Sequence, residues 1–360
     1  MCGIIAVVRR PSERTPTPPE ELLERLESAS VAMAPDVDGL LERLEQAADV
    51  LAQVDLTLRG VPGLQSMLAE PTVVTRLRGA VDRLEQRADA IESLLDGPDG
   101  AAMAGDRLER TNAALIRCRD GSWAIGRDRL RAAEQVAALA APETSDAGLG
   151  VVFSVHQALS ALDRLEVRGR DSAGLELQLV GHGLDAADPA VQALLQRRND
   201  PSFSSGAVRL AGDVLVVVHK AAAEIGELGD NTAALRDALR SDELLAMALA
   251  APGVDGLVLG HTRWASIGII SEPNAHPQSS DELDGTTGPL VTGVLNGDVD
   301  NYADLTASES LRIAAEITTD AKVIPTLMSR QLAAGVAPSE AFRETVAGLD
   351  GSVAIAAASG

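Results

Sequence analysis

The chain has 360 residues, which allows one large domain or two ordinary ones, and 46% of them are hydrophobic, enough for a sizeable core. The formal net charge of -22 argues against nucleic acid as a partner, because phosphate backbones are bound by an excess of Lys and Arg. Two cysteines are too few for a disulfide scaffold. At the N-terminus the apolar run comes before the basic pair Arg9-Arg10, whereas in a signal peptide the basic residues come first. The sequence also has no run of about 18 apolar residues that could span a bilayer. We therefore expect a cytoplasmic protein without nucleic acid or membrane partners.

The chain opens with a predicted strand at residues 2–8, which is rich in Ile and Val. Residues 20–145 follow, with apolar side chains at the spacing of one helix face. Two such stripes are Leu40, Leu44, Ala47, Leu51, Val54 and Leu58, and Leu77, Val81, Leu84, Ala88, Ile91 and Leu95. Pro62-Gly63 and Gly97-Pro98 are expected to break these helices. The stripes fit a helical bundle that packs its own core, which we favour because each seam is short, or a coiled coil that docks a partner.

Residues 150–360 have a different texture, in which short apolar runs alternate with Gly, Asp and Asn turns. Runs such as 214–218 and 257–259 predict strands. Helices are predicted at residues 155–165, 232–249 and 321–332. This mixture indicates an α+β fold.

Cys2 follows Met1, where a small residue permits removal of the initiator methionine. The trimmed chain would carry a thiol and a free α-amine on one residue. An α-amine has a pKa of about 7.7–8.0, so it is partly unprotonated at neutral pH. It can therefore take the thiol proton and later return it to a leaving amine. A buried apolar cysteine is the ordinary alternative, so this feature alone is a weak signal.

Five further segments occur in a fixed order behind Cys2. They are LDRLEVRGRDSAG (162–174), GHTRWASIG (260–268), NAHP (274–277), LNGDVDNY (295–302) and TTDAKVI (318–324). Together they resemble the glutaminase domain of the glutamine–fructose-6-phosphate aminotransferases, which are class II glutamine amidotransferases. Amidophosphoribosyltransferases share the layout but usually read HVRY and NAQP at two of these places, and asparagine synthetases lack HTRW.

The resemblance implies that Cys2 attacks the side-chain amide of L-glutamine and that Asn296 and Gly297 bind the oxyanion, whose charge needs preorganised donors. Taken alone, Asn-Gly would instead predict a type I′ turn. The resemblance also implies that Arg263 binds the substrate's α-carboxylate, a role suited to a bidentate guanidinium. A surface ion pair is the alternative for Arg263.

The same resemblance assigns the substrate's α-ammonium group to Asp320, for which a helix N-cap is the alternative. It places Trp264 and Ser266 along the glutamine pocket, although Trp264 alone would fit a core position. Arg168 and Gly169 match the family's loop beside the nucleophile. No cofactor is implied, and the spacing of the five histidines argues against a metal site.

The sequence departs from the family's pattern in several places. Leu295 stands where relatives usually have His before Asn-Gly, which removes a polar contact. Ser266-Ile267-Gly268 replaces the usual THG, so that the hydroxyl is kept and an imidazole is lost. The helical region also separates the first strand from the remaining segments, and loops tolerate such insertions thermodynamically.

We therefore expect a four-layer αββα Ntn-hydrolase sandwich, incomplete at its C-terminus. Residues 2–10 would form its first strand, residues 11–149 a helical insertion and residues 150–360 the remainder. The resemblance implies sugar-isomerase acceptor domains, in the same longer chain or on a partner, that convert fructose 6-phosphate to glucosamine 6-phosphate, and it allows a homodimer. Two alternatives stay open: a class II amidotransferase with a different acceptor, and a non-catalytic module for assembly or glutamine sensing.

Overall fold

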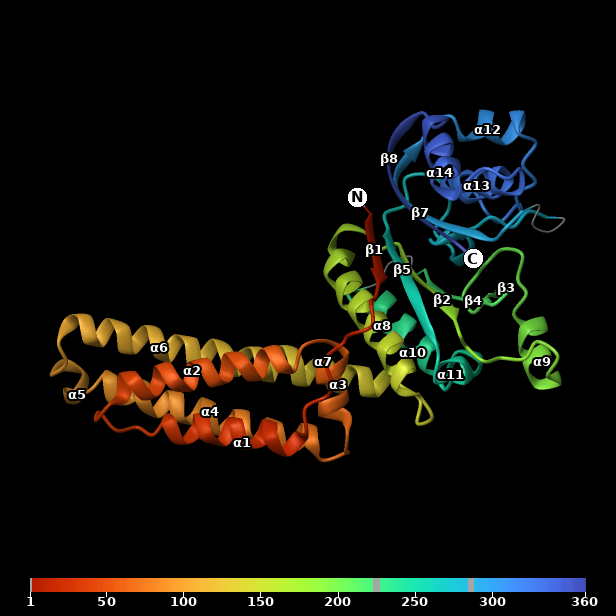
Figure 1. Cartoon of the computed structure of the whole chain (residues 1–360). Coiled ribbons are helices and arrows are strands. Elements are labelled where there is room, and N and C mark those ends of the chain that lie inside the picture. The colour runs from red at the N-terminus through yellow and green to blue at the C-terminus, as the bar shows by residue number, and fades with distance from the viewer. Residues whose placement is uncertain (1, 223–226, 284–287) are drawn as a thin grey trace. The chain divides into compact units, whose positions relative to one another are not determined.

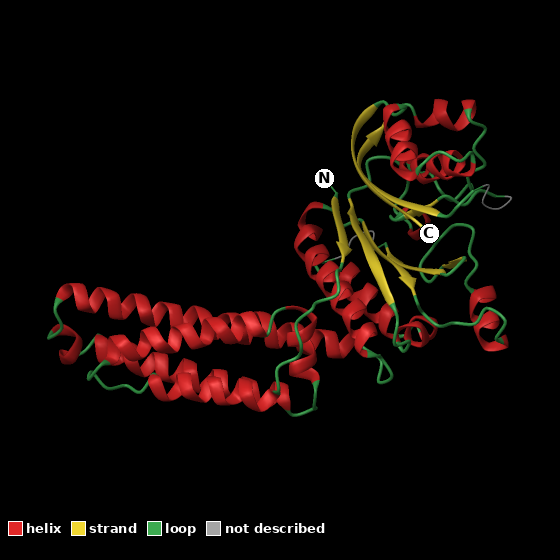
Figure 2. Ribbon diagram, in the orientation of Figure 1, coloured by secondary structure: helices red, strands yellow, loops and turns green. Residues whose placement is uncertain are grey.

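Strand β1 (Gly3–Val8) confirms the predicted N-terminal strand. The computed structural model describes residues 2–222, 227–283 and 288–360. After β1 the chain leaves for a separate helical unit of residues 10–138, and it then returns to a larger unit made of residues 1–9 and 139–360 (Figure 1). The larger unit combines helices with antiparallel sheets, which confirms the α+β class (Figure 2).

The helical unit is built around four long helices that pack against one another. Its elements are α1 (Pro19–Ala32), α2 (Leu40–Thr57), α3 (Gly60–Leu68), α4 (Val73–Leu95), α5 (Pro98–Ala101), α6 (Gly105–Trp123), the π-helical segment η1 (Ala124–Leu130) and α7 (Arg131–Leu139). Every residue of both predicted stripes is buried. The bundle interpretation is therefore confirmed, since each stripe packs into the core of its own unit.

One predicted helix break is wrong. Pro62-Gly63 lies inside α3, whereas the preceding helix ends at Thr57. A proline in the first turn of a helix costs no hydrogen bond, because the N–H at that position has no intrahelical partner. The second predicted break is confirmed, since Gly97-Pro98 separates α4 from α5.

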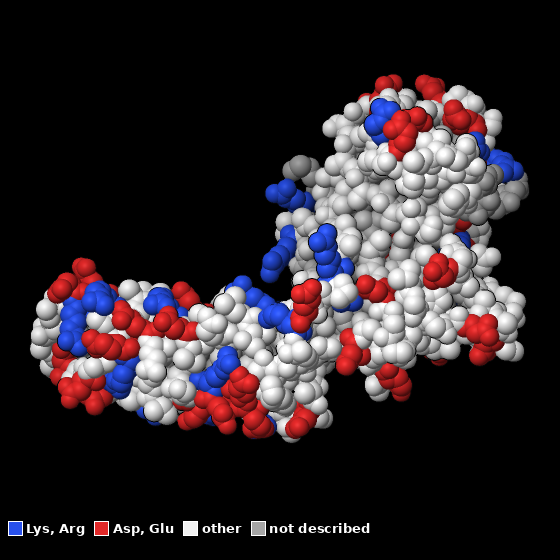
Figure 3. All heavy atoms as spheres, in the orientation of Figure 1, with Lys and Arg blue, Asp and Glu red and all other residues white. Residues whose placement is uncertain are grey.

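Charged side chains of both signs are interspersed on the surface of the helical unit (Figure 3). Many of them pair between helices: Arg76 of α4 is 2.7 Å from Glu20 of α1, and Arg110 of α6 is 3.1 Å from Glu45 of α2. Exposed pairs of this kind each contribute about 0–1 kcal/mol. The stability of the unit must therefore come mainly from its buried aliphatic stripes.

The larger unit contains a five-stranded antiparallel sheet in the order β1-β5-β2-β4-β3. Its other strands are β2 (Ser172–Val180), β3 (Val208–Ala211), β4 (Val214–Ala221) and β5 (Asp255–Arg263). A second sheet has the order β6-β7-β8, with β6 (Gln278–Ser279), β7 (Val291–Val299) and β8 (Gly351–Ser359). The predicted strands at 214–218 and 257–259 are thus confirmed within β4 and β5.

Helices flank both sheets. They are α8 (Asp146–Leu165), η2 (Glu166–Arg168), α9 (Pro189–Arg197), α10 (Asp230–Arg240), α11 (Glu243–Leu249), η3 (Glu272–Asn274), α12 (Tyr302–Ser308), η4 (Asp320–Lys322), α13 (Val323–Ala333) and α14 (Pro338–Ala347). Helix α8 packs on β1 and β5, α10 packs on β2 and β4, and α13 packs on β7. The single helix predicted at 232–249 is divided, because the Asp242 carboxylate caps a new helix by accepting from Leu245 N at 3.0 Å. None of the described helices combines the length and apolar character needed to cross a membrane.

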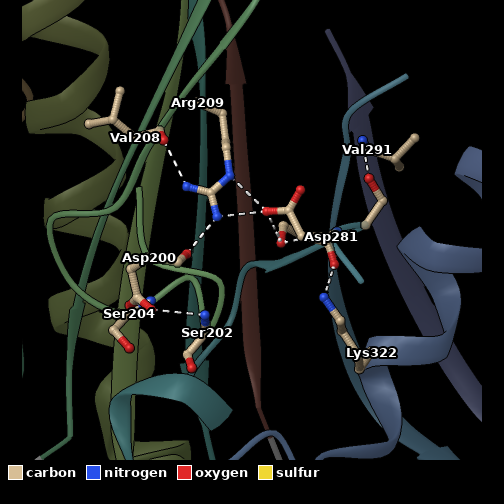
Figure 4. Close-up of polar contacts among 10 residues, drawn as sticks. Asp200, Ser202, Ser204, Val208, Arg209, Asp281, Val291 and Lys322 are labelled. Carbon is tan, nitrogen blue, oxygen red and sulfur yellow. Dashed lines mark hydrogen bonds and ion pairs between the residues drawn. The ribbon is translucent and has the colours of Figure 1, made fainter. Parts of the chain in front are cut away.

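Polar side chains connect the two sheets in the interior (Figure 4). Arg209 on β3 donates from Nε to Asp281, which follows β6, at 2.7 Å. Lys322 is fully buried and donates from Nζ to the Ser279 carbonyl at 2.6 Å. Burial lowers the pKa of Lys322 to about 8. Because each partner of the Arg209–Asp281 pair is largely shielded from water, loss of one would leave a buried charge uncompensated.

We expect Asp281→Asn to lower the free energy of unfolding of the larger unit by about 3 kcal/mol, because it removes the ion-pair partner of the largely buried Arg209 guanidinium. Urea unfolding can be followed by Trp264 fluorescence after Trp123, in the helical unit, is replaced by Phe. The control is Glu340→Gln, which breaks an exposed pair with Arg343 on α14 and should leave the midpoint unchanged. Equal midpoints for the two variants would contradict the prediction.

Candidate active site

Cys2 lies where strand β1 meets the end of β5. The antiparallel register pairs Gly3 with Thr262, so Cys2, one residue before β1, lies opposite Arg263 and next to Trp264. Trp264 N–H donates to Cys2 Sγ at 3.3 Å, and Sγ lies 3.6 Å from the Trp264 carbonyl oxygen. Cys2 N donates to Asn296 Oδ1 on β7 at 3.3 Å. Three segments that are remote in the sequence therefore meet at this thiol.

The environment of Cys2 favours the protonated thiol. Partial burial raises its pKa above the ordinary cysteine value, and the nearby carboxylate of Asp298 acts in the same direction. The Trp264 N–H and the positive charge of Arg263 oppose this rise without cancelling it. A nucleophile at this position therefore needs a base to remove its proton.

Asn296 and Gly297 do not form the turn that Asn-Gly suggests by itself. They lie within strand β7, where they pair with Ala354 and Val353 of β8. Gly297 has a φ of 136°, in the region that favours glycine, and an added Cβ would lie 1.8 Å from the carbonyl oxygen of Ser352. Glycine is therefore required here by the backbone and by the neighbouring strand.

Two histidines fix the backbone of Leu295, directly before Asn296. His261 Nε2 lies 2.8 Å from the Leu295 carbonyl oxygen, and Leu295 N–H donates to His276 Nδ1 at 3.2 Å. The two rings are 4.3 Å apart. Both are completely buried, and burial lowers the pKa of His261 to about 3 and lowers that of His276 as well. These neutral rings position the strand that carries Asn296.

We expect both rings to be neutral Nε2–H tautomers, because one Nε2 faces a carbonyl oxygen and the other ring accepts at Nδ1. Side-chain 15N NMR should show His261 and His276 untitrated at pH 5, with His261→Gln and His276→Gln for assignment. The unfolded chain protonates histidine near pH 6.5, so the free energy of unfolding should fall as the pH drops below that value. A ring that titrates near pH 6.5 in the folded protein would contradict this assignment.

Arg263 is buried, with 3% of its surface exposed, so the surface ion pair considered as an alternative is wrong. Its guanidinium donates to the carbonyl oxygens of Ile267 and Ile269, the first through Nη2 and the second through Nη1 at 3.1 Å. The side chain therefore shapes the loop that follows β5. A guanidinium has five N–H donors, so these two bonds leave others for a ligand.

The loop after β5 places Trp264 and Ser266 beside Cys2 and β7. The Trp264 side chain is 59% exposed, so its core alternative is wrong. The Ser266 hydroxyl donates to Asp298 Oδ1.

The space beside Gly3 is closed to a ligand. A Cβ added to Gly3 would lie 2.7 Å from the Cβ of Leu165, so the Leu165 side chain already fills this space.

Asp320 precedes α13 in η4, and its carboxylate does not cap a helix. Oδ2 accepts from Val299 N at 2.7 Å, and Oδ1 lies 3.3 Å from the Thr319 hydroxyl. Burial raises the pKa of Asp320, and the nearby charge of Asp298 adds to this rise. The charge of Asp320 also acts on Arg263, so the two residues share one region of the site.

The loop at 168–171 contacts the backbone of Arg263. An added Cβ at Gly169 would lie 2.9 Å from the Arg263 carbonyl carbon, so only glycine fits this approach. Asp171 N donates to the Arg263 carbonyl oxygen at 3.1 Å, and Ala265 N donates to Asp171 Oδ2 at 2.7 Å. The Arg168 side chain is exposed and makes no hydrogen bond to Cys2 within the described part of the chain.

Two carboxylates in the site had no predicted role. Asp171 holds the Trp264–Ser266 loop through Ala265 N, and Asp298 faces Ser266. Both lie within segments that signalled the site, RGRDSAG and LNGDVDNY. Their place within these segments was the only sequence feature that could have identified them as site residues. A single sequence does not indicate which way an aspartate side chain points within a site.

Known proteins resemble this chain over about half its length, although no family profile matches it. It is 34% identical over 198 residues to the glutamine–fructose-6-phosphate aminotransferase (isomerizing) of Bacillus thuringiensis subsp. konkukian. The aligned residues make up 55% of this chain and 24% of that enzyme. The enzyme of the same name from Halobacterium salinarum is 31% identical over 174 residues, 48% of this chain and 25% of the relative. That of Mesorhizobium japonicum is 39% identical over 106 residues, 29% of this chain and 16% of the relative. The resemblance predicted from the sequence segments is therefore confirmed.

Proposed function

We propose that the larger unit is a class II glutamine amidotransferase domain that hydrolyses L-glutamine to glutamate and ammonia through a γ-glutamyl thioester on Cys2. The observation that carries this proposal is the convergence on Cys2 of the Trp264 backbone, which contacts the thiol, and of the Asn296 side chain, which accepts from Cys2 N. The similarity to the aminotransferases supports it. Two facing sheets with helices against them also favour the four-layer αββα Ntn-hydrolase sandwich.

The first step needs a base, because the thiol is protonated in its resting environment. Removal of Met1 would turn Cys2 N into an amine that takes the thiol proton. Sulfur then bonds to the amide carbon of glutamine, and the carbon–nitrogen bond breaks as the amine returns the proton to the leaving ammonia. Water, deprotonated by the same amine, hydrolyses the thioester to glutamate and restores the thiol.

The oxyanion formed in these steps would be bound by Asn296 and Gly297. Asn296 Oδ1 already accepts from Cys2 N, which leaves Nδ2 as a donor on the same side chain. The two histidines on Leu295 hold this segment in one orientation. A preorganised donor of this kind typically contributes a factor of about 100 to 1,000 to kcat.

Substrate recognition would combine Arg263, for the α-carboxylate, with Asp320, for the α-ammonium group. Trp264 and Ser266 would line the pocket, and Gly169 and Arg168 would organise the loop beside Arg263. The burial of Arg263 favours this role, because a charge-assisted bond is strengthened where water is excluded.

The fate of the ammonia is proposed from the relatives' names. The chain spans 24% of the length of the first of these relatives. We place the use of ammonia, the conversion of fructose 6-phosphate to glucosamine 6-phosphate, in sugar-isomerase domains of a longer chain or of a partner. Residues 11–149 would then be an insertion between the first strand, residues 2–10, and the rest of the amidotransferase domain, residues 150–360.

A glutamine analogue with an electrophilic group in place of the amide should label Cys2 in a chain that has lost Met1. Intact-mass and peptide analysis would detect both changes. Cys118 provides the internal control, because it is fully buried and burial raises its pKa to about 11. Cys118→Ser should label normally and Cys2→Ser should not. Retention of Met1, or no label under conditions that modify a known amidotransferase, would contradict the proposal.

Asn296→Ala should lower kcat for glutamine hydrolysis by a factor of about 100 to 1,000 and change KM little, because its donor acts mainly on the transition state. Steady-state ammonia release measures both constants. Asn199→Ala is the matched control, since Asn199 is exposed and remote in sequence from every site segment. A loss confined to KM would argue against an oxyanion role for Asn296.

A further inference from the structure

Asp298 continues the row of site residues along strand β7. Side chains two positions apart on a strand point to the same face, so Asp298 follows Asn296 on the face that meets Cys2. The Ser266 hydroxyl bonds to its Oδ1, and Ser266 follows the Trp264 backbone that brackets the thiol. Asp298 is therefore placed in the site by its position on β7 and by one contact to the loop after β5.

The charge of Asp298 reaches the groups that define the site. Burial is the main cause that raises the pKa of the Cys2 thiol and that of Asp320, and the charge of Asp298 is a smaller contribution in the same direction for both. Two carboxylates and a thiol thus share a region whose nearby cation, Arg263, is tied to two backbone carbonyls. A bound cation would relieve the repulsion between the carboxylates.

Asp320 and Asp298 differ in whether both of their carboxylate oxygens already accept hydrogen bonds. Each oxygen of Asp320 is already engaged, Oδ2 with Val299 N and Oδ1 with the Thr319 hydroxyl. Within the described ranges, Asp298 bonds only through Oδ1, and its side chain is partly exposed. Oδ2 of Asp298 is therefore the acceptor that is better placed to meet an incoming donor.

We propose that Asp298 is a second substrate-binding carboxylate, which together with Asp320 binds the α-ammonium group of the amino-acid substrate. An ammonium group carries three donors, enough for both carboxylates at once. Ser266 then acts as a positioning residue, because its hydroxyl fixes one oxygen of Asp298 and turns the other toward the ligand. This inference rests on the proposed function, because it takes glutamine as the substrate.

The test compares two ligands that differ only in the ammonium group: L-glutamine and 5-amino-5-oxopentanoate, which is glutamine without its α-amine. Calorimetry on the full chain with Cys2→Ser measures binding without turnover. We expect Asp298→Asn in this background to weaken glutamine about tenfold to a hundredfold, the usual effect of losing a hydrogen bond to a charged group. The affinity of the same Asp298→Asn variant for 5-amino-5-oxopentanoate should stay unchanged. The matched control is Asp300→Asn, because Asp300 is exposed beyond the end of β7.

The outcomes separate the two proposals. If Cys2→Ser binds glutamine but Asp298→Asn affects both ligands equally, or neither, the role of Asp298 is overturned and the proposed function stands. If Cys2→Ser does not bind glutamine at all, both are overturned.

Discussion

The antiparallel pairing of β1 with β5 is the constraint on which the site depends. Its register, Gly3 with Thr262, places Cys2 beside the backbone of Trp264. A slip of one residue would turn every β1 side chain to the opposite face of the sheet and carry Cys2 away from Asn296. The chain makes this pairing across the intervening helical unit, whose buried stripes give it a core of its own.

The second constraint is the way in which the two sheets are joined. They meet through polar groups as well as aliphatic side chains: the histidines that hold Leu295, and the pair Arg209–Asp281. Buried polar groups of this kind are costly unless they are paired, so a displacement of one sheet that broke these pairs would be penalised. Lys322, which is buried as well, donates to the Ser279 carbonyl. Polar pairing thus fixes the geometry that aliphatic packing alone would leave loose.

The structure explains locally how the chain accommodates two departures from the family's pattern, Leu295 and Ile267. The Leu295 side chain belongs to an apolar cluster that includes Val299 and Ile324, while the histidines hold its backbone. The Asn296–Gly297 segment is therefore positioned without a histidine at residue 295. Ile267 contributes its carbonyl oxygen to Arg263, an interaction that any side chain would permit. Both replacements change side chains at places where the backbone makes the contact.

The sequence by itself determined the N-terminal strand, the two buried helical stripes, the α+β class and the resemblance to the aminotransferases. These depend on local periodicity and on short segments in a fixed order, which one sequence displays directly. Only the tertiary structure decided that Asn296 and Gly297 lie in a strand, that Arg263 is buried and that Asp298 faces Ser266. Each of these depends on the register between segments remote along the chain, and a pattern of residues within one segment carries no information about its partner's register.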